Sequence, residues 1–376
     1  MINHNKINLN PVIKGLFINN TKAQDSIYES GLMVFNCLKL SDKYIFDYVE
    51  VSIGNCTIPL GYDFYFFNYH PSTMYWLDTG KLKKIPGIII TMILEVLPND
   101  PFVMCPDNHF NGYCVLDPSL KTKNKSVFAF PRPLEIVTCL PNSQENEIPV
   151  IGSFGFATKG KGFQHVVEAV NKEFDRAVVK INMPYGDFVP HSKEYATYIG
   201  NLCKKKAKEG IQVIITHDYM EKRALIDWCA RNTLNCFLYD RNLPGLSATT
   251  DQAIVSGRPL SVSQNDTFRH ILAYLQPYPN VSLRQSIRES TLSVKQMQKD
   301  WSPEVFSIKF EEMLAVLIKR LPSKNKIKGE FVLPLLKNGF IELLKKRYRK
   351  YKRFLSVRKI KQVLTSRKKI NDEELI

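Results

Sequence analysis

The sequence predicts an α/β protein built from two Rossmann-like domains that face each other across a cleft. Three observations lead to this prediction. The chain has 376 residues, which suits two hydrophobic cores better than one. In both halves, short apolar segments alternate with segments of helical periodicity, as in parallel sheets made of right-handed βαβ units. A polar segment bounded by prolines lies between the two halves and has the composition of a linker.

These observations divide the chain into four parts. We expect an N-terminal Rossmann-like domain over residues 1–140, a linker over 141–149, a C-terminal Rossmann-like domain over 150–325 and a basic amphipathic helical tail over 326–376.

The first half contains aromatic and β-branched runs that are typical of strands. Strands are expected over residues 12–19, 44–51, 62–70, 87–97, 114–118 and 126–134, with a helix over 25–40. The run at 87–97 is almost continuously apolar, which indicates a strand buried on both faces.

The second half repeats the alternation more clearly. Strands are expected over 148–154, 176–183, 211–216, 235–239 and 258–263, with helices from about residue 161 and over 192–210, 220–232, 247–257 and 301–320. In the last of these helices Ser302 is the expected N-cap and Pro303 the first helical residue.

A glycine-rich, basic loop leaves the first strand of the second half. "GSFGFATKGKGF" runs from Gly152 to Phe163, and its site residues are Gly152, Ser153, Gly155, Lys159, Lys161 and Gly162. Ligands of open parallel sheets bind beyond the carboxyl ends of the strands. Glycines let the backbone approach an anion, the N–H groups and dipole of the following helix attract it, and two lysines can neutralise a diphosphate. The pattern is neither Walker A nor a strict GxGxxG motif, so a plain surface turn is the alternative.

A second segment with the same character follows a later strand. Gly245, Leu246 and Ser247 stand where the helix at 247–257 is expected to begin. Two such sites in one domain, both on the carboxyl side of strands, can hold one diphosphate from two sides.

On these residues the chain resembles the GT-B glycosyltransferases, above all the large retaining group that uses nucleotide sugars. "IGSFGFATKGKGFQHVVEAV" and "GLSATTDQAIVSGRPL" are similar to the two donor-binding stretches of that group. The resemblance covers roughly residues 148–275 and is only architectural over the first 140. It implies that residues 1–140 form the acceptor domain and residues 150–325 the donor-binding domain. It also implies that Lys161 and Gly162 hold the donor diphosphate, with Gly245, Leu246 and Ser247 cradling its phosphates and sugar.

The chain departs from this family pattern at one important point. The family usually has two glutamates flanking the second helix start, and the corresponding positions here are Pro244 and Gln252. Asp251 is adjacent and either replaces a glutamate or simply begins a helix. The departure leaves the retaining mechanism, and activity itself, open.

Two residues of the first domain are candidates for catalysis. His70 follows an expected strand, where an imidazole can act as a base or hydrogen-bonding partner, or can pack near the turn that it begins. Glu95 ends the apolar run and is a candidate general base for an inverting reaction, or a solvated strand end.

Three further charged residues stand close to expected strand ends. They are Asp240, Arg241 and Arg269, and an arginine at such a place can bind phosphate in a bidentate manner or be an ordinary surface residue.

The charge of the chain is concentrated in its tail. The net charge is +16, and residues 341–376 hold 13 Lys/Arg and 4 Asp/Glu, which gives +9 there and leaves +7 for the other 340 residues. Apolar residues recur every three or four positions, so 341–370 reads as a basic amphipathic helix. An anionic membrane surface is one candidate partner and a docked or solvated helix is the alternative, whereas nucleic acid is not expected because no recognition motif is present.

The sequence therefore predicts a glycosyltransferase of the hexosyltransferase type that moves a sugar from a nucleoside diphosphate sugar to a glycan or lipid-linked acceptor. The alternatives are a non-catalytic GT-B-like interaction protein and a GT-B-fold nucleotide-sugar epimerase. No cofactor and no metal ion are expected, because the chain has no DxD motif and no Cys/His cluster with ligand spacing. The eight cysteines form no CxxC pair and the polar N-terminus does not resemble a signal peptide, which favours the cytoplasm, with the tail on the inner face of a membrane.

Overall fold

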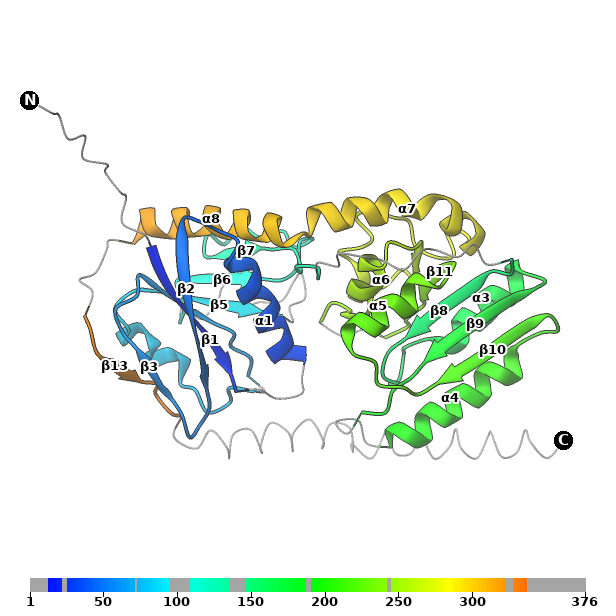
Figure 1. Cartoon of the computed structure of the whole chain (residues 1–376), viewed down its shortest axis with the longest axis horizontal. Helices are drawn as coiled ribbons and strands as arrows, with labels where there is room; N and C mark the ends of the chain where they lie inside the picture. Colours follow the sequence, from blue (N-terminus) through cyan, green and yellow to red (C-terminus); the bar gives the residue numbers. More distant parts are fainter. Residues whose placement is uncertain are drawn as a thin grey trace, which may run out of the picture.

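The computed structural model contains two parallel sheets, each covered by helices (Figure 1). It describes residues 13–21, 26–71, 73–94, 109–135, 147–186, 191–241, 245–321 and 327–336. The expected arrangement of two Rossmann-like domains is confirmed.

The first sheet has six strands in the order β2-β1-β4-β5-β6-β7, and all neighbours are parallel. Its strands are β1 (Ile13–Asn20), β2 (Tyr44–Val51), β4 (Phe64–Phe67), β5 (Ile88–Ile93), β6 (Gly112–Val115) and β7 (Val127–Ala129). Helix α1 (Ser26–Leu38) connects β1 to β2, and a 3-10 helix, η1 (Thr79–Lys84), precedes β5.

The second sheet has five parallel strands in the order β10-β9-β8-β11-β12. Its strands are β8 (Val150–Phe154), β9 (Ala177–Asn182), β10 (Ile211–Thr216), β11 (Leu234–Phe237) and β12 (Leu260–Val262). Its helices are α3 (Phe163–Glu173), α4 (Ser192–Lys206), α5 (Lys222–Ala230), α6 (Thr249–Val255), the 3-10 helix η2 (Asp266–Phe268) and α7 (Leu283–Asp300).

Both sheets are buried on both faces. Successive side chains of a strand point to opposite sides of the sheet, and in both sheets each side meets a hydrophobic core. In β4, Phe64 and Phe66 belong to one core, whereas Tyr65 and Phe67 belong to the core on the other face. The same division holds in the second sheet, where Cys236 and Phe237 contribute to different cores.

The helix α8 (Pro303–Arg320) packs on the first sheet, although it follows the second domain in sequence. Phe306 and Phe310 lie in the same buried core as Phe66, and the rings of Phe66 and Phe310 stack with centroids 5.2 Å apart. Ser302 caps the helix and Pro303 begins it, as expected. The boundary expected at residue 325 is therefore not where the chain leaves the second domain: α7 and α8 run end to end from one domain to the other (Figure 1).

Residues 330–332 also depart from expectation. The sequence predicts that they belong to the helical tail. In the structure they form the strand β13 (Glu330–Val332), which pairs antiparallel with β3 (Thr57–Pro59) (Figure 1). Leu333 is fully buried in the first domain. The rest of the expected tail, including 341–370, lies outside the described residues, as does most of the linker 141–149.

The packing of α8 predicts a large effect of truncating Phe310. Its side chain is fully buried among aromatic rings, so Phe310→Ala should lower the free energy of unfolding by about 3–5 kcal/mol. Urea denaturation followed by circular dichroism measures this. Ile308→Ala, on the same helix but 55% exposed, is the control and should change stability by less than about 0.5 kcal/mol. Equal losses in the two variants would show that α8 does not hold the first core together.

Candidate functional site

The glycine-rich loop lies between β8 and α3, at the carboxyl end of the central strand. Gly155 has φ +133° and Gly162 has φ +65°, conformations that L side chains rarely adopt. A Cβ on Gly162 would lie 1.8 Å from the Leu238 carbonyl oxygen. Glycine is therefore required at 162 both by its φ and by the close approach of the strand-end backbone, and this contact fixes the start of α3 against β11.

The loop carries Lys161 into a buried position. Its Nζ donates a hydrogen bond of 2.7 Å to the Tyr239 hydroxyl and lies 4.4 Å from the centroid of that ring. Burial lowers the pKa of the Lys161 ammonium. Within the part of the chain that the structure describes, no carboxylate lies at ion-pair distance from this ammonium. Among the described residues, a phenol hydroxyl and a ring face hold this buried positive charge, which is electrostatically suited to an anion.

The Tyr239 hydroxyl that binds this ammonium is linked to two further hydroxyl groups. The Tyr239 and Thr249 hydroxyls are 2.9 Å apart, and the Thr249 and Ser247 hydroxyls are 2.7 Å apart. Burial opposes ionisation of Tyr239, but the Lys161 charge and the hydrogen bonds outweigh it and lower the pKa of Tyr239. Tyr239 was not among the predicted site residues. The position of Tyr239 at the end of an expected strand was the available signal.

The second predicted segment meets the first at these hydroxyls. Ser247 is buried, whereas Gly245 and Leu246 are partly exposed and precede α6. The helix begins at Thr249 rather than at 247, because the Thr250 hydroxyl donates a 2.6 Å hydrogen bond to the Ser247 carbonyl and makes a turn first. The two expected donor segments are thus brought together, with Gly155 between them: a Cβ there would lie 3.4 Å from Lys161 Nζ and 3.2 Å from Thr249 Cγ2.

Two of the predicted site residues lie within the expected strand rather than on the loop that follows it. Gly152 lies inside β8, and a Cβ there would lie 1.9 Å from Asn232 Nδ2, so its glycine serves packing. Ser153 is fully buried within the same strand. Lys159 is on the loop and exposed.

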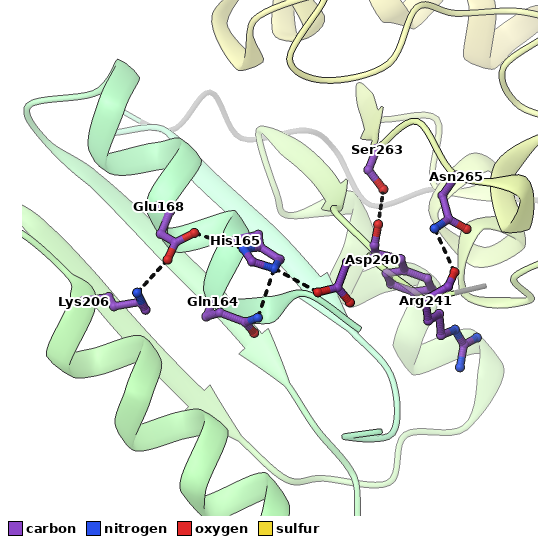
Figure 2. Close-up of polar contacts among 9 residues, drawn as sticks. Gln164, His165, Glu168, Lys206, Asp240, Arg241, Ser263 and Asn265 are labelled. Carbon is purple, nitrogen blue, oxygen red and sulfur yellow. Dashed lines mark hydrogen bonds and ion pairs between the residues drawn. The ribbon is translucent and has the colours of Figure 1, made fainter. Parts of the chain in front are cut away.

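A second polar cluster lies on the outer side of the loop (Figure 2). His165, in the first turn of α3, contacts Glu168 through Nδ1 at 3.0 Å and Asp240 through Nε2 at 3.2 Å. Lys206 of α4 binds Glu168 at 2.7 Å. Asp240 is half exposed and is used in this cluster, while the Arg241 guanidinium lies 5.2 Å from the centre of the Tyr239 ring. The cluster therefore braces the loop that carries Lys161 against the end of β11.

Two other predicted site residues connect the domains. Asp251 of α6 forms a buried ion pair of 2.9 Å with Arg132, and Arg269 forms one of 2.7 Å with Asp117. Burial raises the pKa of Asp251 even though Arg132 opposes the shift. Both Asp251 and Arg269 thus have partners in the first domain, and Glu29 and Lys222 add a more exposed pair at 3.2 Å.

The candidates of the first domain are only partly described. His70 follows β4, and its carbonyl accepts hydrogen bonds from Thr73 and Met74, which makes it the first residue of a tight turn. Glu95 lies outside the described residues.

An aromatic pair that was not predicted stands beyond β9 and β10. The rings of Tyr185 and His217 are stacked, with centroids 4.7 Å apart and planes at 20°, and Tyr185 is 40% exposed. Asn182 connects this pair to the loop. It accepts a hydrogen bond from the Gly155 N–H at 3.0 Å and donates one to the Asp218 carbonyl at 3.0 Å.

Among the described residues, no group of three or more His, Cys, Asp or Glu side chains has the arrangement of a metal site. Over the same residues, no helix is both long enough and apolar enough to span a bilayer.

The interdomain ion pair of Arg269 predicts a large effect of removing one partner. Arg269→Ala leaves the buried Asp117 carboxylate without its guanidinium and should destabilise the protein by about 3–5 kcal/mol. Replacing both partners, Arg269→Met with Asp117→Asn, should restore much of this loss, because no unpaired charge then remains. Lys208→Ala, which breaks an exposed pair with Asp175, is the control and should cost less than about 1 kcal/mol in denaturant unfolding. An Arg269→Ala variant as stable as the control would return Arg269 to the predicted role of a ligand-binding residue.

The His165 cluster predicts a pH dependence of stability. Burial alone would lower the pKa of His165, but Glu168 and Asp240 raise it above its ordinary 6.5. The stabilisation that charged His165 provides is then fully present below that ordinary value and is lost as the pH rises through the raised pKa. Chemical denaturation at about pH 6 and about pH 8 should show a larger difference between wild type and His165→Gln at the lower pH, by less than about 1 kcal/mol because the groups are partly exposed. A difference that is the same at both pH values would contradict the charged state of His165.

No protein-family model matches the chain, and no curated protein is significantly similar to it in sequence. Solved structures are similar to it in three dimensions. HepE of Anabaena, solved in complex with UDP, has a TM-score of 0.54 at 10% identity and covers 81% of this chain and 100% of its own. Sucrose-phosphate synthase of Thermosynechococcus elongatus has a TM-score of 0.55 at 10% identity, over 82% of this chain and 100% of its own. OtsA has a TM-score of 0.54 at 10% identity, over 82% and 100%. With two Rossmann-like domains in the arrangement of these structures, the chain has the GT-B fold that its two glycine-containing segments led us to expect.

Proposed function

We propose that this protein is a glycosyltransferase that moves a hexose-type sugar from a nucleoside diphosphate sugar to a glycan or lipid-linked acceptor. The observation that carries the proposal is the buried Lys161 ammonium, which has no carboxylate partner among the described residues and stands at the carboxyl end of β8. The GT-B fold and the UDP bound to HepE support it.

The diphosphate of the donor supplies the counter-charge that Lys161 lacks. A lysine ammonium has three N–H groups, and Tyr239 accepts one of them. The other two N–H groups of the Lys161 ammonium can donate hydrogen bonds to phosphate oxygens. The hydroxyls of Ser247 and Thr249 add donors that carry no charge of their own. A leaving diphosphate gains negative charge as the sugar departs, so a fixed cation in a desolvated place stabilises the transition state more than the substrate.

The stacked Tyr185 and His217 rings are proposed to lie under the nucleotide base. Tyr185 follows β9, which neighbours β8, and His217 follows β10, which neighbours β9. Asn182 links Gly155 to Asp218, the residue after His217. Base stacking on aromatic side chains contributes about 1–3 kcal/mol per base.

We propose that no metal ion takes part, with lysines and backbone N–H groups in its place, and that His70 or Glu95 serves the acceptor. The six described cysteines are free, which fits a reducing cytoplasm. We place the basic segment 341–370 on the inner face of a membrane, where a lipid-linked acceptor would be found.

A second candidate function is a GT-B protein that binds the nucleotide without transferring the sugar. The ion pair between Asp251 and Arg132 favours it. Asp251 is the acidic residue next to Gln252, one of the two positions where the GT-B family usually has a glutamate. Its carboxylate is bound to Arg132.

Thermal unfolding in the presence of UDP, GDP, ADP and their common sugars tests the donor site. A matching nucleotide at about 100 times its dissociation constant should stabilise the wild type by about 2.7 kcal/mol. Lys161→Met should abolish this stabilisation. The same variant without ligand should be as stable as the wild type or more stable, because a buried charge is replaced by an apolar side chain of similar size. Lys172→Ala, at an exposed position of α3, is the control and should keep the full shift.

The outcomes separate the candidates. A lysine with a purely structural role would make Lys161→Met less stable and leave the wild type unresponsive to every nucleotide. Binding of one nucleotide without transfer to any acceptor would select the non-catalytic function, and detectable transfer would exclude it.

A further inference from the structure

An apolar surface is exposed where the chain returns to the first domain. Val332, Leu335 and Leu336 are 66%, 46% and 42% exposed, whereas Leu333 between them is fully buried. Backbone hydrogen bonds hold this segment in place: Leu333 N–H donates to the Cys56 carbonyl at 2.7 Å and Leu336 N–H to the Trp76 carbonyl at 2.8 Å. The exposed aliphatic side chains are therefore presented by an ordered backbone rather than by a loose end.

The segment is bridged at Leu335 to Leu77, just before the 3-10 helix η1, and η1 carries three lysines. Lys81, Lys83 and Lys84 belong to η1, whose Leu82 is fully buried, so the helix has a fixed inner side. Lys81 and Lys84 are three residues apart and project on the same side of a 3-10 helix. The Asp78 N–H donates to the Pro334 carbonyl at 2.8 Å, which sets the start of η1 against the apolar segment. We call Val332, Leu335, Leu336 and these three lysines the β13–η1 face.

The charge of this face is positive overall. Lys81 is paired with Asp78 at 2.8 Å, whereas Lys83 and Lys84 form no ion pair with any described residue. The exposed carboxylate nearest to Val332 in sequence is that of Glu330, at the other end of β13. Exposed aliphatic side chains flanked by lysines are the composition of a surface that lies at a lipid interface.

We propose that the β13–η1 face docks on an anionic membrane surface. The leucines and Val332 would enter the interfacial region while the lysines contact lipid phosphates. The proposal rests on described residues of the first domain and is independent of sugar transfer.

Other occupants of this face are disfavoured by charge or by chemistry. The chain's own segment 341–376 carries +9, so covering the face with it would bring like charges together. A second copy of the face would do the same across a two-fold axis. Nucleic acid would use the lysines but would leave the aliphatic side chains in water. An anionic bilayer is the partner that uses both the aliphatic side chains and the lysines of the face. It can bind the basic segment 341–370 at the same time.

Vesicle flotation of the full-length chain tests the proposal, with phosphatidylcholine vesicles that contain or lack phosphatidylserine. Wild type should float with the anionic vesicles only. Replacing Lys81, Lys83 and Lys84 by glutamine should weaken binding on the order of 100-fold, since each basic residue near an anionic surface contributes roughly fivefold. Leu335→Ser with Leu336→Ser should weaken it at least about tenfold, because two buried apolar side chains are lost.

Matched variants control for charge and hydrophobicity in general. Glutamine at Lys193, Lys204 and Lys205 of α4 removes the same charge from the second domain, and Leu292→Ser with Ile308→Ser removes exposed aliphatic side chains elsewhere. Both control variants should bind like the wild type. Equal losses in the face and control variants, or no binding by the wild type, would overturn the proposal.

Hydrogen exchange measured on the bound protein separates the face from the basic segment that follows it. Amides of residues 79–84 and 330–336 should exchange more slowly with anionic vesicles than without them. Protection confined to residues after 336 would also overturn the proposal. Nucleotide-dependent thermal shifts, measured on the same samples, report the proposed donor site separately.

Discussion

The position of β8 at the centre of its sheet is the constraint on which the candidate site depends. β8 has β9 on one side and β11 on the other, and all three strands are parallel, so their carboxyl ends open at the same edge. This order brings Lys161 from the loop after β8 to Tyr239 at the end of β11. It also allows the peptide of Gly155 to bind Asn182 at the end of β9. A different strand order with the same loops would leave the lysine exposed and without the hydroxyls that hold it.

The two domains are joined by more than the linker. Two residues of the first domain, Arg132 and Asp117, each form a buried ion pair with the second domain. The first domain provides the cation in one pair and the anion in the other. The helices α7 and α8 make a further connection, and Leu134 N–H binds the Trp301 carbonyl where they meet. Because Asp251 of the interdomain pair stands in the helix that begins with Thr249, the interdomain contact and the Lys161 site share one short element.

The sequence allowed the fold class and the strands of the two parallel sheets to be predicted, but not the order of the strands, since alternating apolar and helical periodicity is a local property. The glycine-rich loop, Lys161 and Gly162 also lie where they were expected. The roles of Asp251 and Arg269 were not accessible, because their partners are 119 and 152 residues away in the chain and nothing local indicates them. Gly152 shows a second limit: a glycine that makes room for Asn232 looks the same in a sequence as one that makes room for a phosphate. The amphipathic pattern of α8 predicted a helix correctly, but an apolar stripe does not say which of two sheets it covers.

The return of α8 to the first sheet sets an order of events during synthesis. The strands of the first sheet leave the ribosome early, yet one of their two faces is completed by Phe306, Phe310, Met313, Leu314 and Leu317. At about 5–20 residues per second, the roughly 150 residues between the linker and α8 take on the order of 10–30 s to make. During that interval the nascent first domain presents an uncovered aromatic face, so the domain that is translated first is the one that finishes folding last.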